Sequence, residues 1–499
     1  MNLTESLLKA ESAGDTCISE SDAKKLKVSY SKYADRDIVA VKKGEDRYFS
    51  LEKYNELEKN IAQNLCNILS CKSSEIPSRN VIDSILAVLD EKGTLDPHQR
   101  DAVYMACENQ VMILTGGPGT GKTFTVNMIC KTLMQLYPHK TVLCCAPTGK
   151  ASRRMTESTG MPAFTLHKKL EITADNMEPS NLNASIVVVD ETSMLDTEVA
   201  NALFKAVLPG TKLILVGDID QLPSVGAGAV LRDMIESGVV PTNMLTKTFR
   251  QKGESLIIDN AKNIRDGITK IDVNSEFLIC STAEAKAYGY NSEEYLVNAY
   301  LSKVAQYGVE NVALLTPYKK EKFATGADHL NKVIQARYNP DGEGIEYKGT
   351  VFKEGDRVMQ LENRRECANG DVGTISKVTN KYITVEYIDG SVDYTSDELN
   401  QLTLAYALSV HKSQGSEYKA VISCMLNEHS AMQKRNLLYT AVTRAKKDFI
   451  LLYDYDALKK CIETDATNSR KTNLKERLVQ VAKFKNLAYK ADTQRKEAV

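Results

Sequence analysis

The sequence lacks any hydrophobic run long enough to cross a membrane. None of its apolar stretches reaches the roughly 18 residues that a membrane-spanning helix requires. The N-terminal sequence MNLTESLLKAESAGD is acidic, and it does not show the basic residues followed by an apolar run that mark a signal peptide. We therefore expect a cytoplasmic protein with no membrane segment.

Net charge and metal-ligand motifs are also missing. The 64 Lys and Arg residues are balanced by 65 Asp and Glu residues, so any contact with nucleic acid must come from local basic stripes and not from a global positive field. The 11 cysteines form no C-x-x-C pair and the 6 histidines show no H-E-x-x-H spacing, which argues against a zinc site built by the protein. Cys144 and Cys145 lie in an apolar run, where we expect reduced, buried thiols.

What remains is the composition of an ordinary globular protein, with 42% hydrophobic and 26% charged residues in a chain of 499. This length suits about three domains. Residues 1–94 read as mixed and helical, because YFSLEKYNELEKNIAQNLCNIL places apolar residues near helical spacing. This region carries no motif that indicates a function.

Short β-branched runs separated by helical stretches begin after residue 94. They are VMILT (111–115), TVLCCA (141–146), SIVVVD (185–190) and KLILVGD (212–218), followed by NVALLT (311–316), KAVISCML (419–426) and FILLYD (449–454). Runs that are apolar on both faces are typical of central strands in a parallel sheet covered by helices. The two sets therefore predict two α/β lobes, each with a parallel sheet.

Within the second set, between NVALLT and KAVISCML, residues 340–400 change character. The segments GDRVMQLE, GDVGTISKV, KYITVEY and GSVDYTSDEL alternate apolar and polar residues around Gly and Asp-Gly turns, which predicts a small antiparallel β insertion, most simply a barrel. From Arg470 to Val499 the chain holds nine Lys or Arg against three acids in a loosely helical pattern, which is more typical of a solvated helix than of a binding site.

The clearest motif follows the strand VMILT and precedes a helix-like segment. It reads GGPGTGKT and consists of Gly116, Gly117, Pro118, Gly119, Thr120, Gly121, Lys122 and Thr123, a match to G-x-x-x-x-G-K-[ST] in its strand-then-helix setting. Glycines let the backbone N–H groups wrap phosphates, and the helix N-terminus adds a favourable dipole. Lys122 is predicted to neutralise the β- and γ-phosphates of ATP, and the Thr123 hydroxyl to ligate Mg²⁺.

A second partner for the metal is expected at the end of a neighbouring strand, where SIVVVDETS supplies Asp190 and Glu191. Asp190 is predicted to hold Mg²⁺ through water, and Glu191 to orient and deprotonate the attacking water. Two acids at a strand end are more often a solvated turn, but the phosphate loop about 70 residues earlier favours the functional interpretation. An NTP site alone leaves a motor, a switch and a kinase open.

Further segments resemble the motifs of superfamily 1 helicases of the RecD-like branch, from about Leu95 to Asp454 and in the family order. LILVGDIDQLPSVGAG places Asp218 and Gln221 where the resemblance implies sensing of the γ-phosphate. LDPHQRDAV resembles the adenine-reading motif and implies Gln99 on the base edge. APTGKASRRM resembles the motif that grips DNA, with Thr148 and Lys150 as the implied phosphate contacts, although its basic residues also suit a solvated helix end.

Three more motifs follow further along the chain. LTKTFRQ resembles the fourth motif and implies that Arg250 reaches the γ-phosphate, while LYTAVTRAKKDFILL resembles the sixth and implies that Arg444 is an arginine finger. LTLAYALSVHKSQGSE resembles the fifth and implies that Ser409 and His411 touch DNA and that Gly415 and Glu417 lie by the nucleotide. His411 also suits a hydrogen-bonded histidine in a packed segment. Two arginines facing a phosphate loop engage ATP only when the cleft closes, which ties hydrolysis to lobe movement.

The resemblance implies two RecA-like lobes and a division of the chain into these parts: residues 1–94, an N-terminal region; 95–250, the first lobe; 251–339 with 401–465, the second lobe; 340–400, a Src-homology-like barrel; and 466–499, a basic tail. A strand-separating pin would fall at about 165–185, but LHKKLEITADNMEPSNLNAS is short and polar there. Full-length RecD-like proteins often carry a longer N-terminal region than the one here.

The resemblance implies an ATP- and Mg²⁺-dependent motor that moves 5′ to 3′ on single-stranded DNA, acts at duplex junctions, and works with repair, recombination or phage replication proteins. Two alternatives stay open at this point. One is a DNA-binding subunit that uses ATP as a conformational switch within a larger complex. The other is an RNA helicase of the upstream-frameshift type, which differs in its contacts to the 2′-hydroxyl.

Overall fold

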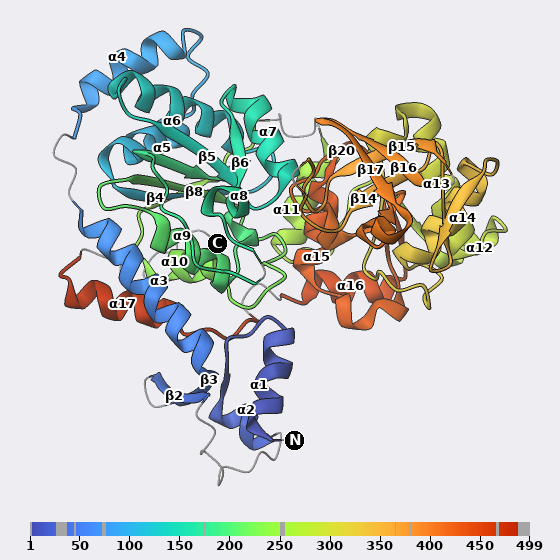
Figure 1. Ribbon diagram of the computed structural model, residues 1–499, viewed down its shortest axis with the longest axis horizontal. Helices are drawn as coiled ribbons and strands as arrows, with labels where there is room; N and C mark the ends of the chain where they lie inside the picture. The colour runs from blue at the N-terminus through green and yellow to red at the C-terminus, as the bar shows by residue number, and fades with distance from the viewer. Residues whose placement is uncertain are drawn as a thin grey trace.

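A computed structural model describes residues 2–25, 37–43, 46–71, 76–173, 175–249, 255–364, 366–379, 381–465 and 469–487. Two α/β lobes lie side by side, and a smaller antiparallel unit packs on the second lobe (Figure 1). Both large sheets are parallel, as the doubly apolar strand runs predicted. The predicted fold class is confirmed. In the described part of the chain, no helix combines the length and the apolarity needed to span a membrane.

The first lobe is a six-stranded sheet in the order β6-β5-β7-β8-β4-β9. Its elements are α5 (Pro97–Glu108), β4 (Val111–Gly116), α6 (Lys122–Leu136), β5 (Val142–Ala146), α7 (Gly149–Thr159), β6 (Ala163–Thr165), α8 (Leu166–Leu170), β7 (Ile186–Val189), α9 (Thr197–Ala206), β8 (Lys212–Gly217), α10 (Val230–Ser237) and β9 (Thr242–Leu245). Strands β4, β7 and β8 are buried along their whole length. The carboxyl ends of these central strands are therefore the places where polar side chains gather.

The second lobe is a five-stranded parallel sheet in the order β10-β21-β20-β11-β19. Its elements are α11 (Leu256–Arg265), β10 (Phe277–Ser281), α12 (Thr282–Ala287), α13 (Ser292–Tyr307), β11 (Val312–Thr316), α14 (Ala327–Tyr338), β19 (Ala407–Ser409), β20 (Tyr418–Met425), α15 (Arg435–Thr443), β21 (Ala445–Tyr453) and α16 (Tyr455–Glu463). Helices α11, α15 and α16 share one core with a face of this sheet. Helix α15 lies on the side of the lobe that faces the first lobe (Figure 1).

The insertion consists of antiparallel strands. They are β12 (Gly344–Tyr347), β13 (Thr350–Lys353), β14 (Arg357–Gln360), β15 (Val372–Val378), β16 (Tyr382–Tyr387), β17 (Gly390–Thr395) and β18 (Leu402–Leu404). Five of them form one sheet in the order β17-β16-β15-β14-β18, and β12 pairs with β13 alone. The insertion shares its hydrophobic core with α13 and α14 of the second lobe. It therefore forms one packed body with that lobe.

The N-terminal region contains the predicted helices and also a sheet that the sequence pattern did not predict. Its elements are α1 (Leu3–Ser12), β1 (Cys17–Ser19), α2 (Glu20–Lys25), β2 (Ile38–Lys43), β3 (Asp46–Leu51), α3 (Glu52–Ser70) and α4 (Arg79–Leu89). The strands form an antiparallel sheet in the order β1-β3-β2. Strands of three to six residues, with much of their surface exposed, give only a weak alternation in the sequence.

The C-terminal segment is partly buried, contrary to the expectation of a solvated helix. Helix α17 (Leu474–Phe484) lies beside α3 under the first lobe (Figure 1), and Leu474, Leu478 and Ala482 are buried in the first lobe's core. The basic residues that suggested a solvated helix occupy the other faces of an amphipathic helix. The chain therefore returns to the first lobe after it has completed the second.

The region predicted to hold the strand-separating pin begins with β6 and α8. After α8 the chain follows an irregular path, and Leu182 forms an isolated bridge to Val207. No β-hairpin occurs among the described residues between 165 and 185.

Candidate functional site

The phosphate loop, residues 116–123, connects the end of β4 to the start of α6. Gly119 and Gly121 have φ angles of +71° and +79°, which glycine adopts without strain. A side chain at Gly121 would collide with the Gln99 amide, and a Cβ at Gly119 would lie 2.7 Å from Cδ1 of Ile258 on α11. The loop therefore packs closely against both lobes, and its glycines are required by space as well as by backbone conformation.

Lys122 begins α6 and folds back over the phosphate loop. Its Nζ donates hydrogen bonds to the carbonyl oxygens of Gly116 and Gly117, the latter at 3.0 Å. The same nitrogen lies 3.9 Å from Oδ2 of the buried Asp218. Carbonyl oxygens and one carboxylate thus surround the ammonium group. These are the anionic and polar partners that phosphate oxygens would replace.

Gln99 contacts the phosphate loop directly, but both ends of its amide have protein partners. Its Nε2 donates to the carbonyl of Thr120 at 3.2 Å, and its Oε1 accepts from the backbone N–H of Asp96 at 3.2 Å, which completes a capping box at the start of α5. The side chain is 1% exposed. Its adenine-reading role stays a prediction, and its contact with Thr120 shows a further role in holding the loop.

Asp190 and Glu191 follow β7 at the predicted edge of the sheet. The Oδ1 of Asp190 accepts the backbone N–H of Glu191 at 2.8 Å, and Glu191 has a φ of +52°. A left-handed conformation in a residue with a side chain costs about 1–3 kcal/mol and is often found at functional sites. Burial first, and the charge of Glu191 second, raise the pKa of Asp190, while Arg154 and Lys122 lower it.

The donor set at this edge suits a hard divalent cation. The Asp190 carboxylate lies within the electrostatic influence of Lys122, and the Thr123 hydroxyl is exposed one residue further along α6. Hydroxyl and carboxylate oxygens are the ligands that Mg²⁺ prefers, and the pKa of Asp190 is raised because burial and Glu191 outweigh the positive charges of Arg154 and Lys122. Thr123 and Asp190 therefore fit the predicted metal site.

The loop between β8 and α10, residues 218–229, contacts the second lobe; we refer to it as the β8–α10 loop. Within it, Nε2 of Gln221 donates to Asp218 at 3.2 Å. The Tyr439 hydroxyl of α15 donates to Asp218 at 3.0 Å, and the backbone N–H of Leu222 donates to Thr440 of the same helix at 2.8 Å. A shift of α15 would therefore change the hydrogen bonding of Asp218, which lies beside Lys122.

Arg250 and Arg444 are the two arginines predicted to reach the γ-phosphate. Arg250 lies outside the described residues. Arg444 follows α15 and is 3% exposed; its guanidinium donates to the carbonyl of Ser416 at 3.1 Å, to the carbonyl of Thr440 at 3.3 Å and to the Thr443 hydroxyl at 3.3 Å. In this conformation its described hydrogen bonds stay within the second lobe.

Gly415 and Glu417 lie at the boundary between the lobes. A Cβ on Gly415 would lie 3.1 Å from the Thr148 hydroxyl, so this segment packs on the start of α7. Glu417 forms ion pairs with Arg154 of α7 and, at 3.0 Å, with Lys446. Burial tends to raise the pKa of Glu417, but Arg154 and Lys446 outweigh it and lower the pKa. Because Arg154 also acts on Asp190, Glu417 is linked through one side chain to the predicted metal site.

All four predicted DNA contacts line a single cavity of about 840 Å³ between the lobes, which we call the basic cavity. These residues are Thr148, Lys150, Ser409 and His411. Five lysines and two histidines line the cavity, and its described lining includes no Asp or Glu. A groove of one charge sign focuses the electrostatic potential for a polyanion. The local basic stripe expected from the near-zero net charge therefore exists.

Two of these residues also make local structural contacts, and a third is affected by burial. The Thr148 hydroxyl accepts the N–H of Ala151 at 3.2 Å and caps α7, so the positive end of that helix faces the cavity. Nζ of Lys150 donates to the Tyr418 hydroxyl at 3.2 Å across the lobe boundary. Burial, with smaller contributions from Arg470 and Lys434, lowers the pKa of His411, so its imidazole is neutral near pH 7.

Comparison with known families agrees with this arrangement. A family described as an AAA domain matches residues 99–227, a UvrD-like helicase C-terminal domain matches residues 404–452, and an ATP-dependent RecD-like DNA helicase SH3 domain matches residues 330–387. The first covers the phosphate loop and Asp190, and the second covers Ser409 and Arg444.

Curated relatives decide the family. The chain is 30% identical over 394 residues to the RecBCD enzyme subunit RecD of Mycobacterium tuberculosis, which covers 70% of this chain and 68% of that protein. The chain belongs to the RecD-like helicase family. It is also 34% identical over 368 residues to the ATP-dependent RecD2 DNA helicase of Deinococcus radiodurans, covering 71% of this chain and 48% of the relative. This RecD-like chain thus spans about half the length of that protein.

Solved Pif1 helicases are similar to this RecD-like chain over much of their length. Pif1 from Candida albicans has a TM-score of 0.44 and 20% identity, covering 79% of this chain and 99% of that one. Pif1 from Bacteroides, in complex with ADP-AlF3 and single-stranded DNA, has a TM-score of 0.45 and 17% identity, covering 84% and 99%.

The structure of the RecD-like chain adds two aromatic residues to the basic cavity that the sequence motifs did not single out. Tyr318 and Phe323 follow β11 and stack on each other, with ring centroids 4.5 Å apart and planes at 17°. His429 packs edge-on against Tyr318, with ring centroids 5.5 Å apart. The signal in the sequence was PYKKEKF, where two aromatic residues flank a lysine-rich run directly after a second-lobe strand.

Arg265 is a second residue that sequence reasoning missed. It ends α11, and its Nη1 lies 3.8 Å from the position that a Cβ on Gly117 would occupy. Its Nε pairs with Asp266 at 2.8 Å. This arginine of the second lobe is therefore close to the phosphate loop in the present conformation. A lone Arg in a helix carries no motif, so only its placement in space identifies it.

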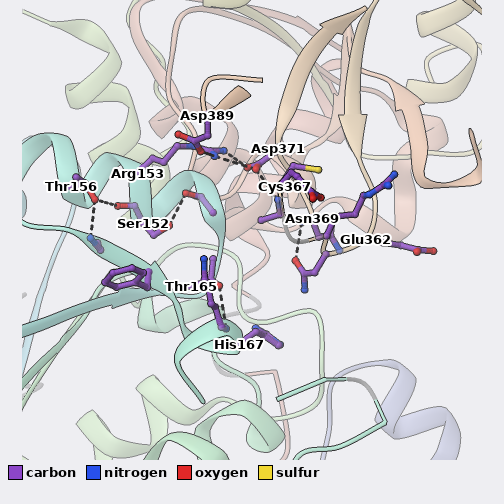
Figure 2. Close-up of a pocket in the computed structure, with 18 of the residues that line it drawn as sticks. Ser152, Arg153, Thr156, Thr165, His167, Glu362, Cys367, Asn369, Asp371 and Asp389 are labelled. Atoms are coloured by element: carbon purple, nitrogen blue, oxygen red, sulfur yellow. Dashed lines mark hydrogen bonds and ion pairs between the residues drawn. The ribbon is translucent and has the colours of Figure 1, made fainter. Parts of the chain in front are cut away.

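A second cavity, of about 1430 Å³, lies between α7 and the insertion; we call it the insertion cavity. Figure 2 shows Arg153 extending from α7 toward Asp371 and Asp389 of the insertion, and its Nη1 pairs with Asp389 at 2.6 Å. Thr165, His167 and Asn369 line both cavities, so the two adjoin. The ion pairs of Arg153 thus join α7 to the insertion beside the basic cavity.

Proposed function

We propose that the chain is an ATP-dependent DNA helicase that moves 5′ to 3′ along single-stranded DNA. One observation carries this proposal: Thr148, Lys150, Ser409 and His411, from two lobes and more than 250 positions apart in the sequence, line one basic cavity next to the nucleotide cleft. The printed name of the Deinococcus relative, an ATP-dependent DNA helicase, supports the activity. The direction follows from the family resemblance.

In this proposal ATP binds between the phosphate loop and the second lobe. Lys122 exchanges its bonds to Gly116 and Gly117 for phosphate oxygens, which are stronger, charged acceptors. Gln99 contacts the base edge, and Gly415 and Glu417 complete the cleft. Mg²⁺, held by Thr123 and Asp190, would neutralise charge on the β- and γ-phosphates when bound. Glu191, which follows Asp190, orients and deprotonates the attacking water.

Hydrolysis depends on closure because groups from both lobes must meet at the γ-phosphate. Gln221 and Asp218 sense the γ-phosphate from the first lobe, and Arg250 and Arg444 approach the γ-phosphate from the far side of the cleft. Asp218 already contacts Tyr439 of α15, the helix that leads to Arg444. Movement of α15 toward the phosphate loop therefore changes the surroundings of Asp218 and of Arg444 in one step. Ordered motions of this kind tie the chemical step to a change of shape.

In the proposal, single-stranded DNA occupies the basic cavity. Its phosphates face the start of α7 at Thr148 and the lysines that line the cavity. Helix N-termini bind phosphate through free backbone N–H groups, and α7 presents its N-terminus here. Because Gly415 packs on Thr148, a change in the nucleotide cleft reaches the strand without passing through a long relay. The proposed domain division follows: residues 95–250 form the first motor lobe, 251–339 with 401–465 the second, and 340–400 the barrel.

Phe323 offers a test of how the cavity holds a strand. Replacing Phe323 with alanine removes one ring of the stacked pair and is expected to weaken binding of single-stranded DNA about tenfold, since stacking of a base on an aromatic ring contributes roughly 1–3 kcal/mol. The measurement is fluorescence anisotropy with a labelled oligonucleotide at fixed salt. Phe323→Tyr, which keeps the ring, serves as the matched control and should bind as the wild type does. Equal affinity of the alanine variant would show that bases do not stack here.

The nature of the nucleic acid is tested by ATP turnover. We expect single-stranded DNA to stimulate hydrolysis by the purified chain and single-stranded RNA to stimulate it much less. Stimulation by RNA alone would favour the upstream-frameshift type of helicase. Stimulation by DNA without any strand displacement would favour an ATP-switched subunit of a larger complex. This alternative is supported by the printed names of the mycobacterial relatives, which describe them as subunits of the RecBCD enzyme. Under either outcome we propose that the chain works with repair, recombination or phage replication proteins.

A further inference from the structure

The β8–α10 loop contacts both proposed sites and the second lobe. It begins at Asp218, beside Lys122. Val225 in its middle is 81% exposed and lines the basic cavity. Between these positions, Leu222 donates its N–H to Thr440, and its carbonyl accepts Nε2 of Gln414 at 2.8 Å. Because Gln414 also lines the basic cavity, the loop connects the nucleotide side to the strand side.

The loop contains neither helix nor strand, so its shape must be fixed by other groups. The main one is Arg470, from the C-terminal segment. Nη1 of Arg470 donates to the Ser224 hydroxyl at 3.0 Å, to the carbonyl of Gly226 at 2.9 Å and to the carbonyl of Gly228 at 2.7 Å. Nη2 donates to the carbonyl of Ser224 at 2.6 Å. A single guanidinium thus holds the C-terminal half of the loop through four acceptors.

Arg470 is itself held in place by the two ends of the chain. A side chain at Gly14 would collide with the guanidinium, so the backbone after α1 covers it closely. The next residue, Lys471, donates its N–H to Asp15 at 2.8 Å, and the carbonyl of Lys471 accepts the N–H of Thr16 at 2.9 Å. The carbonyl of Gly14 accepts the N–H of Gly228 at 2.9 Å. The N-terminal region and the C-terminal segment therefore meet at the β8–α10 loop.

These contacts require arginine in particular. The planar guanidinium presents five N–H donors in a fixed fork, while a lysine presents a compact ammonium on a flexible stem. The described hydrogen bonds of the Arg470 guanidinium go to one hydroxyl and three carbonyl groups of the loop, and the nearby carboxylates of Asp15 and Asp196 also favour its charge. Removing the guanidinium would take this donor from the carbonyls of Ser224 and Gly228, while the Gly226 carbonyl would keep only the Ser224 hydroxyl, so the loop would have to rearrange to satisfy its acceptors.

We infer that Arg470 is a positioning residue that couples ATP turnover to the bound strand by holding the β8–α10 loop in the conformation that contacts both. The inference rests on the proposed function, because coupling requires that both ligands bind. Arg470 is not among the residues that line the basic cavity, although its charge acts on His411 there. It acts through Ser224, Gly226 and Gly228, and it gives the otherwise uninterpreted ends of the chain a role in the motor.

The test compares Arg470→Ala, Arg470→Lys and Lys471→Ala in the full-length chain. Lys471 is the matched control, since it adjoins Arg470 and pairs with Asp22 of the N-terminal region, away from the loop. We measure the ratio of ATP turnover with saturating oligo-dT to turnover without DNA. This ratio is expected to fall about tenfold in Arg470→Ala, within the range by which residues remote from a ligand modulate coupling. Arg470→Lys should recover part of it, and Lys471→Ala should keep the wild-type ratio.

Hydrogen exchange provides a readout that does not depend on DNA. In the absence of ligands, amides of residues 219–229 should exchange faster in Arg470→Ala than in Lys471→Ala. A wild-type ratio in Arg470→Ala, or an equal fall in Arg470→Ala and Lys471→Ala, would overturn the coupling role while the proposed function stands. If DNA does not stimulate the wild type at all, the proposed function fails and the coupling role fails with it.

Discussion

Replacing Arg444 with alanine is expected to lower DNA-stimulated ATP turnover about 1,000-fold, because an arginine finger contributes on the order of 10³ to 10⁵ in rate. The affinity for ATP should change little, since the finger stabilises charge that develops in the transition state. In the structure the guanidinium donates to Ser416, Thr440 and Thr443 within the second lobe, and we expect closure to bring it to the γ-phosphate. Steady-state hydrolysis, with nucleotide binding measured separately, checks both parts.

Arg435→Ala is the matched control for Arg444. Arg435 begins the same helix and donates to the carbonyl of Ile462 at 2.7 Å within the second lobe. It should leave turnover close to that of the wild type once folding is confirmed by circular dichroism. If Arg444→Ala retained more than about a tenth of wild-type turnover, it would not be a finger of the expected strength. Attention would then move to Arg265, which already lies near Gly117.

Replacing Lys122 with alanine is expected to lower both ATP affinity and turnover, the latter about 10² to 10³-fold, as for the loss of one preorganised group that stabilises transition-state charge. Lys122 is held by Gly116, Gly117 and Asp218, and these partners would exchange the ammonium for phosphate oxygens when ATP binds. Binding of single-stranded DNA in the absence of nucleotide should be retained, because the basic cavity does not include Lys122.

The control for Lys122 is Lys131→Ala, an exposed lysine on the same helix. Isothermal titration with ATP and a coupled hydrolysis assay compare the three proteins. Wild-type hydrolysis by Lys122→Ala would place the nucleotide elsewhere, whatever the fate of DNA binding. Loss of activity in Lys131→Ala as well would indicate a folding defect in α6 and would remove the support that the Lys122 result gives.

The central strands and the phosphate loop could be predicted from the sequence because their signals are local. Apolar runs such as VMILT and KLILVGD are buried on both faces as β4 and β8. The glycines of the phosphate loop are required by backbone conformation and by close packing, so their spacing survives as a recognisable motif. The alternating segments of the insertion likewise predicted the antiparallel strands that the structure shows.

Other features could not be predicted because they depend on contacts between distant parts of the chain. Arg470 lies in a basic segment that resembles a solvated helix, and only the fold brings it to Ser224, some 246 positions earlier. Tyr318 and Phe323 belong to no recognised motif, and the sequence shows only that they flank a lysine-rich run. The present contacts of Gln99 and Arg444 were also unexpected, because a motif names the residue that meets a ligand and says nothing of its partners before the ligand binds.

The sharpest test of the account is strand displacement by the purified chain on two otherwise identical duplexes, one with a 5′ single-stranded tail and one with a 3′ tail. The account predicts ATP-dependent displacement on the 5′-tailed duplex, little on the 3′-tailed duplex, and none with Lys122→Ala on either. Displacement confined to the 3′-tailed duplex, or undiminished displacement by Lys122→Ala, would contradict it.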